Sequence, residues 1–168
     1  MDSYQTKDPV ITAVCGIKNS GKTTLINRMV SRLAEWGYRV AVIKHDGHDF
    51  DCDVPGTDSH SYIESGAYGT AVFSANRMFV HRTGTGETEE ELIRLFPDAD
   101  IILLEGLKEK PYRKIEIVRS GISEHPASNP EGRILIVSDL PESGFDEPVL
   151  PPEDLDGILS VLLQDSDL

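Results

Sequence analysis

Residues 16–23 read Gly16-Ile17-Lys18-Asn19-Ser20-Gly21-Lys22-Thr23, which is the pattern G-x-x-x-x-G-K-T. An apolar run, Val10 to Cys15, precedes this octapeptide, and an amphipathic stretch begins after it at Thr24. Glycines at both ends let the backbone curl so that successive N–H groups point at a phosphate, and the N-terminus of the following helix adds its positive dipole. The stretch therefore predicts a phosphate-binding loop, called the phosphate loop below, between a strand and a helix.

The chemistry of the phosphate loop assigns roles to its side chains. Lys22 is expected to reach the β- and γ-phosphate oxygens of a nucleotide, and Thr23 to offer its hydroxyl to Mg²⁺. The complete set of residues expected to bind the nucleotide here is Gly16, Asn19, Ser20, Gly21, Lys22, Thr23 and Thr24.

Length and composition favour one cytoplasmic domain. A chain of 168 residues has room for a single α/β domain, with short tails at about 1–8 and 164–168. Its apolar runs are too short to cross a bilayer, and residues 1–8 lack the features of a signal peptide. The two cysteines, Cys15 and Cys52, suit a reducing compartment better than a disulfide framework.

A formal net charge of −13 excludes several partners. Nucleic acids and anionic lipid surfaces are polyanions, so this protein is repelled from both at long range. We therefore expect neither a nucleic-acid partner nor a membrane partner. A local phosphate site remains compatible with the global charge.

The order of the predicted elements gives the fold class. Strands and helices alternate, and the run Asp100 to Leu104 has no polar alternation, as expected at the centre of a parallel sheet covered on both faces. We predict an α/β fold of the P-loop NTPase kind, a mainly parallel, doubly wound sheet with helices on both faces. Residues 114–119 alternate in part, which predicts a strand nearer the sheet edge. Smaller predicted elements are a helix over 58–65, strands over 70–73 and 78–81, and a capping box of Thr88 with Glu91.

Three acidic residues follow strands where they could face the phosphates: Asp46, Asp53 and Glu105. Magnesium needs only one or two protein oxygens besides phosphates and waters. We predict Asp53 and Glu105 as the catalytic pair, which holds the metal together with Thr23 or positions an attacking water. The alternative for Glu105 is a capping or salt-bridging acid at the sheet edge.

Two further polar groups are candidates for binding anions. Lys44, His45 and His48 are predicted to line the phosphate site. The alternatives are a zinc site formed by His45, His48 and Cys52, or a plain solvated loop. The second group, called the basic strip below, comprises Lys108, Lys110, Arg113, Lys114 and Arg119. It is either an anion-facing surface, with Lys108 near the nucleotide, or a solvated hairpin whose charges balance Glu109 and Glu116.

Four segments together resemble the molybdopterin-guanine dinucleotide biosynthesis protein B (MobB) family. They read G-I-K-N-S-G-K-T-T-L, I-K-H-D-G-H-D-F-D-C-D-V-P-G-T-D-S, E-S-G-A and I-I-L-L-E-G-L-K-E-K-P-Y-R-K-I-E-I-V-R, and the resemblance runs from Val10 to Asp139. Family members often differ at the positions of Gly47, Thr57 and Ser65, none of which lies in the phosphate loop. The N-K-x-D signature of many GTPases is absent, and Ser138-Asp139 is the candidate base reader.

The resemblance implies a GTP-binding protein with weak Mg²⁺-dependent GTPase activity, commonly a homodimer. It further implies work beside the molybdenum cofactor guanylyltransferase, with molybdopterin or molybdoenzymes as further partners. Two other functions stay open on the residues alone: a small-molecule kinase with Lys108 to Arg113 as a lid over the transferred phosphate, and a nucleotide-binding module without turnover.

Overall fold

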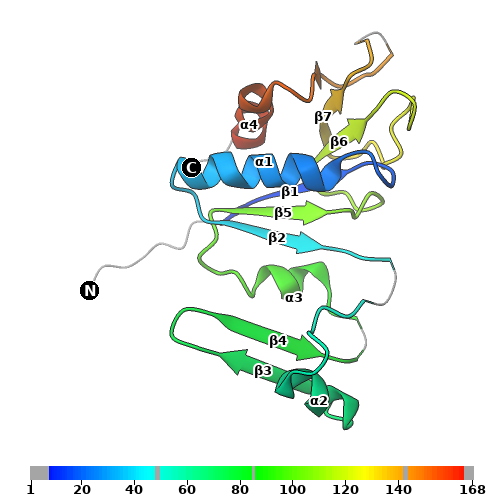
Figure 1. Ribbon diagram of the computed structural model, residues 1–168. Coiled ribbons are helices and arrows are strands. Elements are labelled where there is room, and N and C mark those ends of the chain that lie inside the picture. Colours follow the sequence, from blue (N-terminus) through cyan, green and yellow to red (C-terminus); the bar gives the residue numbers. More distant parts are fainter. Residues whose placement is uncertain (1–7, 48–49, 85, 142–143, 165–168) are drawn as a thin grey trace. The chain divides into compact units, whose positions relative to one another are not determined.

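The computed structural model describes residues 8–47, 50–84, 86–141 and 144–164 (Figure 1). Their contacts form two compact units. The first unit lies within Met1–His45 and Leu92–Leu168, and the second is Asp46–Glu91. The expectation of a single domain over 1–168 stays a prediction. Within the described residues, no helix combines the length and apolar character that crossing a membrane requires.

The first unit is built on a six-stranded sheet in the order β2-β5-β1-β6-β7-β8. All neighbouring strands pair in parallel, which confirms the predicted α/β class. The strands are β1 (Val10–Cys15), β2 (Val40–Lys44), β5 (Ile101–Glu105), β6 (Lys114–Val118), β7 (Arg133–Ser138) and β8 (Val149–Leu150).

Helices α1 (Lys22–Glu35) and α4 (Leu155–Leu163) pack on one face of this sheet (Figure 1). Leu25, Met29 and Leu159 are among the side chains that they bury against β1, β5, β6 and β7. Full burial of such a side chain contributes about 1.5–3 kcal/mol. The other face is covered by the short helix α3 (Glu89–Ile93) and by residues 107–112, which pack on Ala13, Cys15 and neighbouring side chains.

Strand β6 lies inside the sheet, between β1 and β7, so the prediction that it lies near an edge is wrong. Its partial alternation misled because Lys114 and Glu116 are buried, at 0% and 1% exposure, rather than turned to solvent. The Lys114 ammonium donates to the carbonyls of Lys108, Lys110 and Asn129. Buried charged residues that find hydrogen-bond partners inside the protein give the same alternation of polar and apolar residues in the sequence as a half-exposed strand.

The second unit contains α2 (Asp58–Glu64) and an antiparallel hairpin of β3 (Gly69–Phe73) and β4 (Met78–Arg82). The Thr57 side chain caps the first turn of α2 by accepting from the backbone N–H of His60. Both the helix and the hairpin were expected from the sequence. The predicted capping box is also present, since Thr88 and Glu91 exchange backbone and side-chain hydrogen bonds at the start of α3.

Candidate functional site: the phosphate loop and the strand ends around it

The phosphate loop has the backbone that its glycines require. Gly16 and Gly21 have positive φ angles of 141° and 99°, and Asn19 has φ 65°. A Cβ on Gly16 would lie 2.6 Å from Ser20 Oγ and 2.8 Å from the carbonyl oxygen of Ile117. Any side chain at this position would therefore push the phosphate loop away from β6. Asn is one of the few residues that tolerate the left-handed region.

Lys22 begins α1 and folds back over the phosphate loop. Its Nζ donates to the carbonyl oxygens of Gly16 at 3.1 Å and Ile17 at 2.8 Å. The helix N-cap, Gly21, makes no side-chain capping bond, and the first turn contains no acidic residue. Backbone N–H groups at the N-terminus of α1 and one ammonium are thus directed at the same region, which is the arrangement that favours an anion.

The Ser20 hydroxyl is a further polar group of the loop that could bind a phosphate. The residue is fully buried, and its Oγ has no hydrogen-bond partner among the described residues. Buried polar atoms are rarely left unpaired. A phosphate oxygen held by the loop would satisfy this hydroxyl, so the donor set of the loop fits a phosphorylated ligand.

Thr23, Lys44 and Glu105 meet beside the phosphate loop. Thr23 Oγ1 donates to Glu105 Oε1 at 3.4 Å, and Lys44 Nζ lies 3.7 Å from the same oxygen. Strand pairing explains the meeting, because Lys44 ends β2 directly opposite Glu105 at the end of β5. The hydroxyl and carboxylate oxygens fit the small number of protein ligands that Mg²⁺ takes beside phosphates and water. Of the predicted metal ligands, the structure brings Thr23 and Glu105 together.

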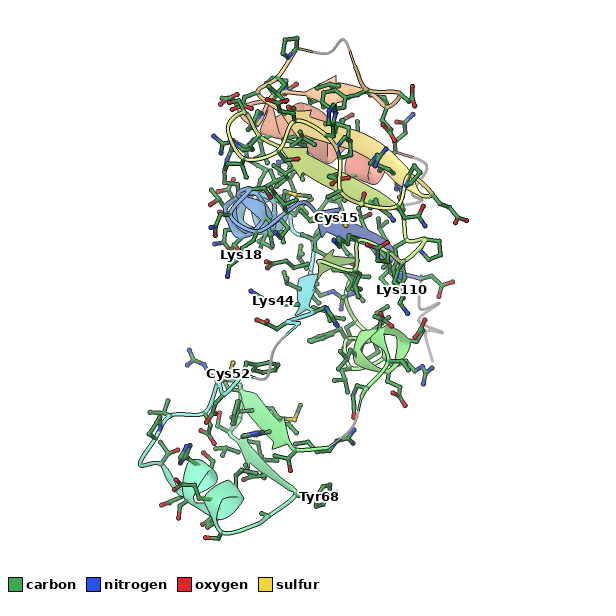
Figure 2. The ribbon with its side chains drawn as sticks, turned by 90° about the vertical axis from the view of Figure 1, so that its right-hand side faces the viewer. Cys15, Lys18, Lys44, Cys52, Tyr68 and Lys110 are labelled. Carbon is green, nitrogen blue, oxygen red and sulfur yellow. The ribbon has the colours of Figure 1, made fainter. Side chains whose placement is uncertain are left out.

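Backbone contacts fix the position of Glu105. Its carbonyl accepts from the backbone N–H of His45, and the N–H of Gly106 donates to Val14 on β1. The thiol of Cys15 donates to the Gly106 carbonyl at 2.9 Å, and burial raises its pKa to about 11. Cys15 therefore stays a neutral donor that helps to hold the turn after β5; Figure 2 shows it inside the sheet, with Lys44 at the end of β2.

The remaining predicted site residues are divided between the units. Asp53 belongs to the second unit, where its carboxylate accepts from the N–H of Val54 and from the hydroxyl of Ser59 and so orders the turn before α2. Its proposed role with Glu105 stays a prediction. His48 lies outside the described residues. Lys108 places its ammonium 3.8 Å from Glu109 at the surface, in the first unit.

The basic strip is not one surface. Lys114 is buried, and Arg113 donates to the carbonyl oxygens of Val161 and Leu162 in the last turn of α4. Arg119 lies 3.7 Å from the carboxylate of Asp139. Both predicted alternatives, an anion-facing surface and a solvated hairpin, are therefore wrong for Lys114 and Arg113, because backbone carbonyls bind both charged groups. Arg119 is 44% exposed beside its partner, so an anion-facing role for this residue stays a prediction.

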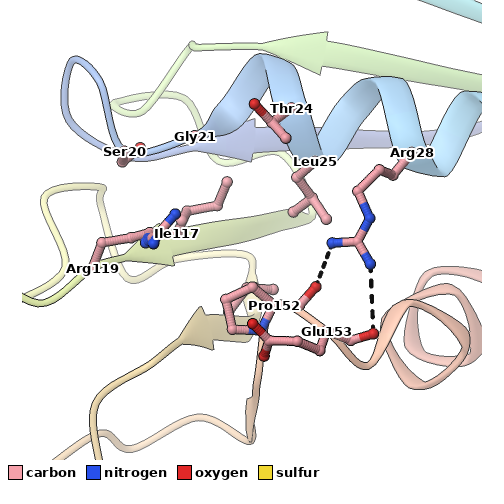
Figure 3. Close-up of a pocket in the computed structure, with 10 residues that line it drawn as sticks. Ser20, Gly21, Thr24, Leu25, Arg28, Ile117, Arg119, Pro152 and Glu153 are labelled. Atoms are coloured by element: carbon pink, nitrogen blue, oxygen red, sulfur yellow. Dashed lines mark hydrogen bonds between the residues drawn. The ribbon is translucent and has the colours of Figure 1, made fainter.

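A cavity of about 210 Å³ adjoins the phosphate loop on the side of β6 and β7 (Figure 3). One wall comes from α1 and the loop, and the others come from the strand ends and the turn before α4. Arg28 holds that turn by donating to the carbonyl oxygens of Pro152 and Glu153. The lining residues are Ser20, Gly21, Thr24, Leu25, Arg28, Ile117, Arg119, Val137, Pro152 and Glu153.

The sequence interpretation missed most of this cavity. No motif marks Arg28 as a site residue, and Pro152 and Glu153 are distant from the phosphate loop in sequence. The packing of α1 against the C-terminal part of the chain brings these residues together at the cavity. Arg119 was assigned to the basic strip. Its place as the first residue after a strand adjacent to β1 was the available signal, because ligands of open parallel sheets bind outside the carboxyl ends of the strands.

A parallel sheet with the loop G-x-x-x-x-G-K-T between its β1 strand and α1 helix defines an α/β protein of the P-loop NTPase class. Comparison with known proteins narrows this class. The family model of molybdopterin guanine dinucleotide synthesis protein B, MobB, matches residues 11–139. The chain belongs to this family, as its sequence motifs indicated.

Relatives agree with the family model. The molybdopterin-guanine dinucleotide biosynthesis adapter protein of Escherichia coli is 31% identical over 162 residues, covering 92% of this chain and 91% of the relative. A probable adapter protein of the same name from Bacillus subtilis is 35% identical over 115 residues, 64% of each chain. The solved structure of Bacillus subtilis MobB has a TM-score of 0.71 at 28% identity, with 90% of this chain and 97% of that chain covered.

Proposed function

We propose that this protein is a GTP-binding adapter in the biosynthesis of molybdopterin guanine dinucleotide, with weak Mg²⁺-dependent GTP hydrolysis. The phosphate loop carries the proposal: Lys22 and the N-terminus of α1 face one region, and the buried Ser20 hydroxyl lacks a partner among the described residues. The adapter role is supported by the names of the relatives in Escherichia coli and Bacillus subtilis.

The residues around the phosphate loop have distinct proposed tasks. Lys22 exchanges its loop carbonyls for β- and γ-phosphate oxygens, and Thr23 and Glu105 hold Mg²⁺ directly or through water. When bound, the metal neutralises charge on the phosphates. Lys44, which lies 3.7 Å from Glu105, keeps that carboxylate oriented. Asp53 is proposed to assist from the second unit.

For the kinase alternative, residues 108–113 would have to move as a lid. Hydrogen bonds oppose this, because the Lys108 and Lys110 carbonyls accept from the buried Lys114 and the Arg113 guanidinium caps α4. Each such bond to a charged group contributes about 1.5–3 kcal/mol. A segment held in this way is better suited to a fixed wall than to a closing lid, which favours the adapter.

We further propose a homodimer whose contact surface includes the β3–β4 hairpin. Phe73, Met78 and Val80 lie on one face of this hairpin and are all at least half exposed, and Val72 is half exposed on the other face. A two-stranded hairpin is marginally stable alone, and exposed apolar patches of this kind mark interaction sites. The expected experiment is light scattering of the wild type and of Phe73→Ser; a wild type that is monomeric at micromolar concentration would contradict the homodimer.

Reconstitution of cofactor guanylation tests the function. The guanylyltransferase, molybdopterin, GTP and Mg²⁺ are assayed with wild-type protein, with Lys22→Ala and without addition. We expect stimulation by the wild type only. Turnover that rises steeply with a small-molecule acceptor and without the guanylyltransferase would favour the kinase. Nucleotide-dependent stability without turnover or stimulation would favour the module that only binds nucleotide.

A further inference from the structure

Among the charged residues that line the cavity, Arg119 lies beside the phosphate loop and has no role in the proposed function so far. Arg119 is the first residue after β6, and its Nη1 lies 3.7 Å from the position that a Cβ on Gly21 would occupy. The guanidinium is therefore beside the loop itself, and Figure 3 shows it between the loop and the wall formed by Pro152 and Glu153. Its side chain is 44% exposed, so it can be reached from solvent.

A tether holds this guanidinium in place. Arg119 Nε lies 3.7 Å from Asp139 Oδ2, and Ser120 donates its backbone N–H and its hydroxyl to the two oxygens of Asp139. These hydrogen bonds from Ser120, more than the charge of Arg119, lower the pKa of Asp139, which is therefore an anion at neutral pH. Asp139 thus has partners within the protein. Two guanidinium groups line the cavity; Arg28 donates to the carbonyls of Pro152 and Glu153, and Arg119 is the one beside the phosphate loop.

The position of the cavity next to the phosphate loop indicates which part of a nucleotide would occupy it. Thr24, the residue after Thr23, lines it, so the cavity begins where the phosphate loop enters α1. Its volume of about 210 Å³ is below the ~300–1,000 Å³ of sites for whole drug-sized ligands. It suits one part of a nucleotide, with an apolar floor that includes Leu25, Ile117 and Val137. A flat guanidinium above an apolar floor fits an aromatic base.

We propose that Arg119 binds the nucleoside half of the nucleotide, with its guanidinium plane against the base. This inference rests on the proposed nucleotide binding and deepens it. Lys22 and the loop amides then hold the phosphates, while Arg119 and the cavity hold the base. Asp139 positions Arg119 and does not itself read the base, which differs from the expectation for Ser138-Asp139.

Calorimetry with two probes separates the halves of the ligand. GTP contains both halves, and inorganic tripolyphosphate contains only the phosphates. We expect Arg119→Gln to weaken GTP binding roughly tenfold, which lies between the effects of exposed and of desolvated cation–π contacts, and to leave tripolyphosphate affinity unchanged. Arg119→Lys should fail to restore GTP affinity, because an ammonium keeps the charge without the plane. Lys22→Ala should lose both ligands.

Controls make each outcome decisive. Arg32→Gln removes an arginine of α1 that pairs with Asp156 and Glu35 away from the cavity, and it should bind both probes as the wild type does. Equal loss of both probes in Arg119→Gln would make Arg119 a phosphate ligand and overturn the inference, as would wild-type GTP affinity in either Arg119 variant. If the wild type binds neither probe, the proposed function fails as well. Melting temperatures check that the variants fold.

Discussion

Two buried glutamates on nearby strands of one sheet have opposite surroundings. Glu116 on β6 accepts from the N–H groups of Ala127 and Ser128, from the Ser128 hydroxyl and from Arg133. Within the part of the chain that the structure describes, the side-chain partners of Glu105 on β5 are Thr23 at 3.4 Å and Lys44 at 3.7 Å. The protein satisfies the first carboxylate almost completely and leaves acceptor capacity on the second. Such spare capacity at a strand end is what we expect of the role proposed for Glu105 in metal binding, whereas the hydrogen bonds of Glu116 are those of an acid that stabilises the fold.

Removal of Glu116 should have the largest effect on stability. Glu116→Ala leaves Arg133 and the backbone donors of residues 127 and 128 buried without their acceptor. Breaking a buried pair in this way costs about 3–5 kcal/mol. Urea unfolding should show this loss, and Glu116→Gln, which keeps an acceptor oxygen, should lose less. Wild-type stability of Glu116→Ala would show that the network contributes nothing to the fold.

Removal of the Glu105 charge should instead leave stability nearly intact and affect hydrolysis. Glu105→Gln keeps the shape, and loss of a carboxylate that places metal or water lowers hydrolysis about a hundredfold, ~2.7 kcal/mol. Single-turnover cleavage of GTP measures the effect, with Asp53→Asn assayed in parallel. Wild-type cleavage by both folded variants would remove both carboxylates from the mechanism. A defect in Glu105→Gln alone would confine the metal site to the first unit.

The same comparison shows what the sequence could predict. The phosphate loop and the four aliphatic residues of β5 were readable because local spacing encodes them, and Glu105 followed from its place at a strand end. Lys114, Glu116 and Arg113 were misread because a charged residue in a sequence normally indicates solvent. Their partners, such as Ser128 and the carbonyls at the end of α4, come from distant segments. Sequence spacing cannot supply such pairings, and the same reason hid the cavity around Arg119.

Removal of the charge of Lys44, the exposed partner of Glu105, should have a smaller effect on stability and on GTP cleavage. Its side chain is 56% exposed and its ammonium is 3.7 Å from the carboxylate, so the pair contributes about 0–1 kcal/mol to stability. Lys44→Gln should therefore unfold close to the wild type, while its Mg²⁺ requirement for GTP cleavage changes if the lysine orients Glu105. Titration of cleavage against Mg²⁺ tests this, and a wild-type titration curve would reduce Lys44 to a surface charge.

The smallest predicted effect concerns the two cysteines, which differ as the two glutamates do. Cys15 is buried in β1 and donates to Gly106, with its pKa raised to about 11, whereas Cys52 is exposed in the second unit. The thiolate is the reactive form, so at pH 8 the folded protein should be alkylated by iodoacetamide at Cys52, and at Cys15 only after unfolding. Because the pKa of Cys15 is raised by folding, its thiol stays protonated until the pH approaches 11, and the folded state loses stability as alkaline pH ionises the unfolded thiol first.

Peptide mass spectrometry after a timed alkylation measures both sites. Equal modification of Cys15 and Cys52 in the folded protein would mean that the strand end beside the phosphate loop opens readily, and the fixed placement of Glu105 inferred from the Gly106 turn would then be wrong.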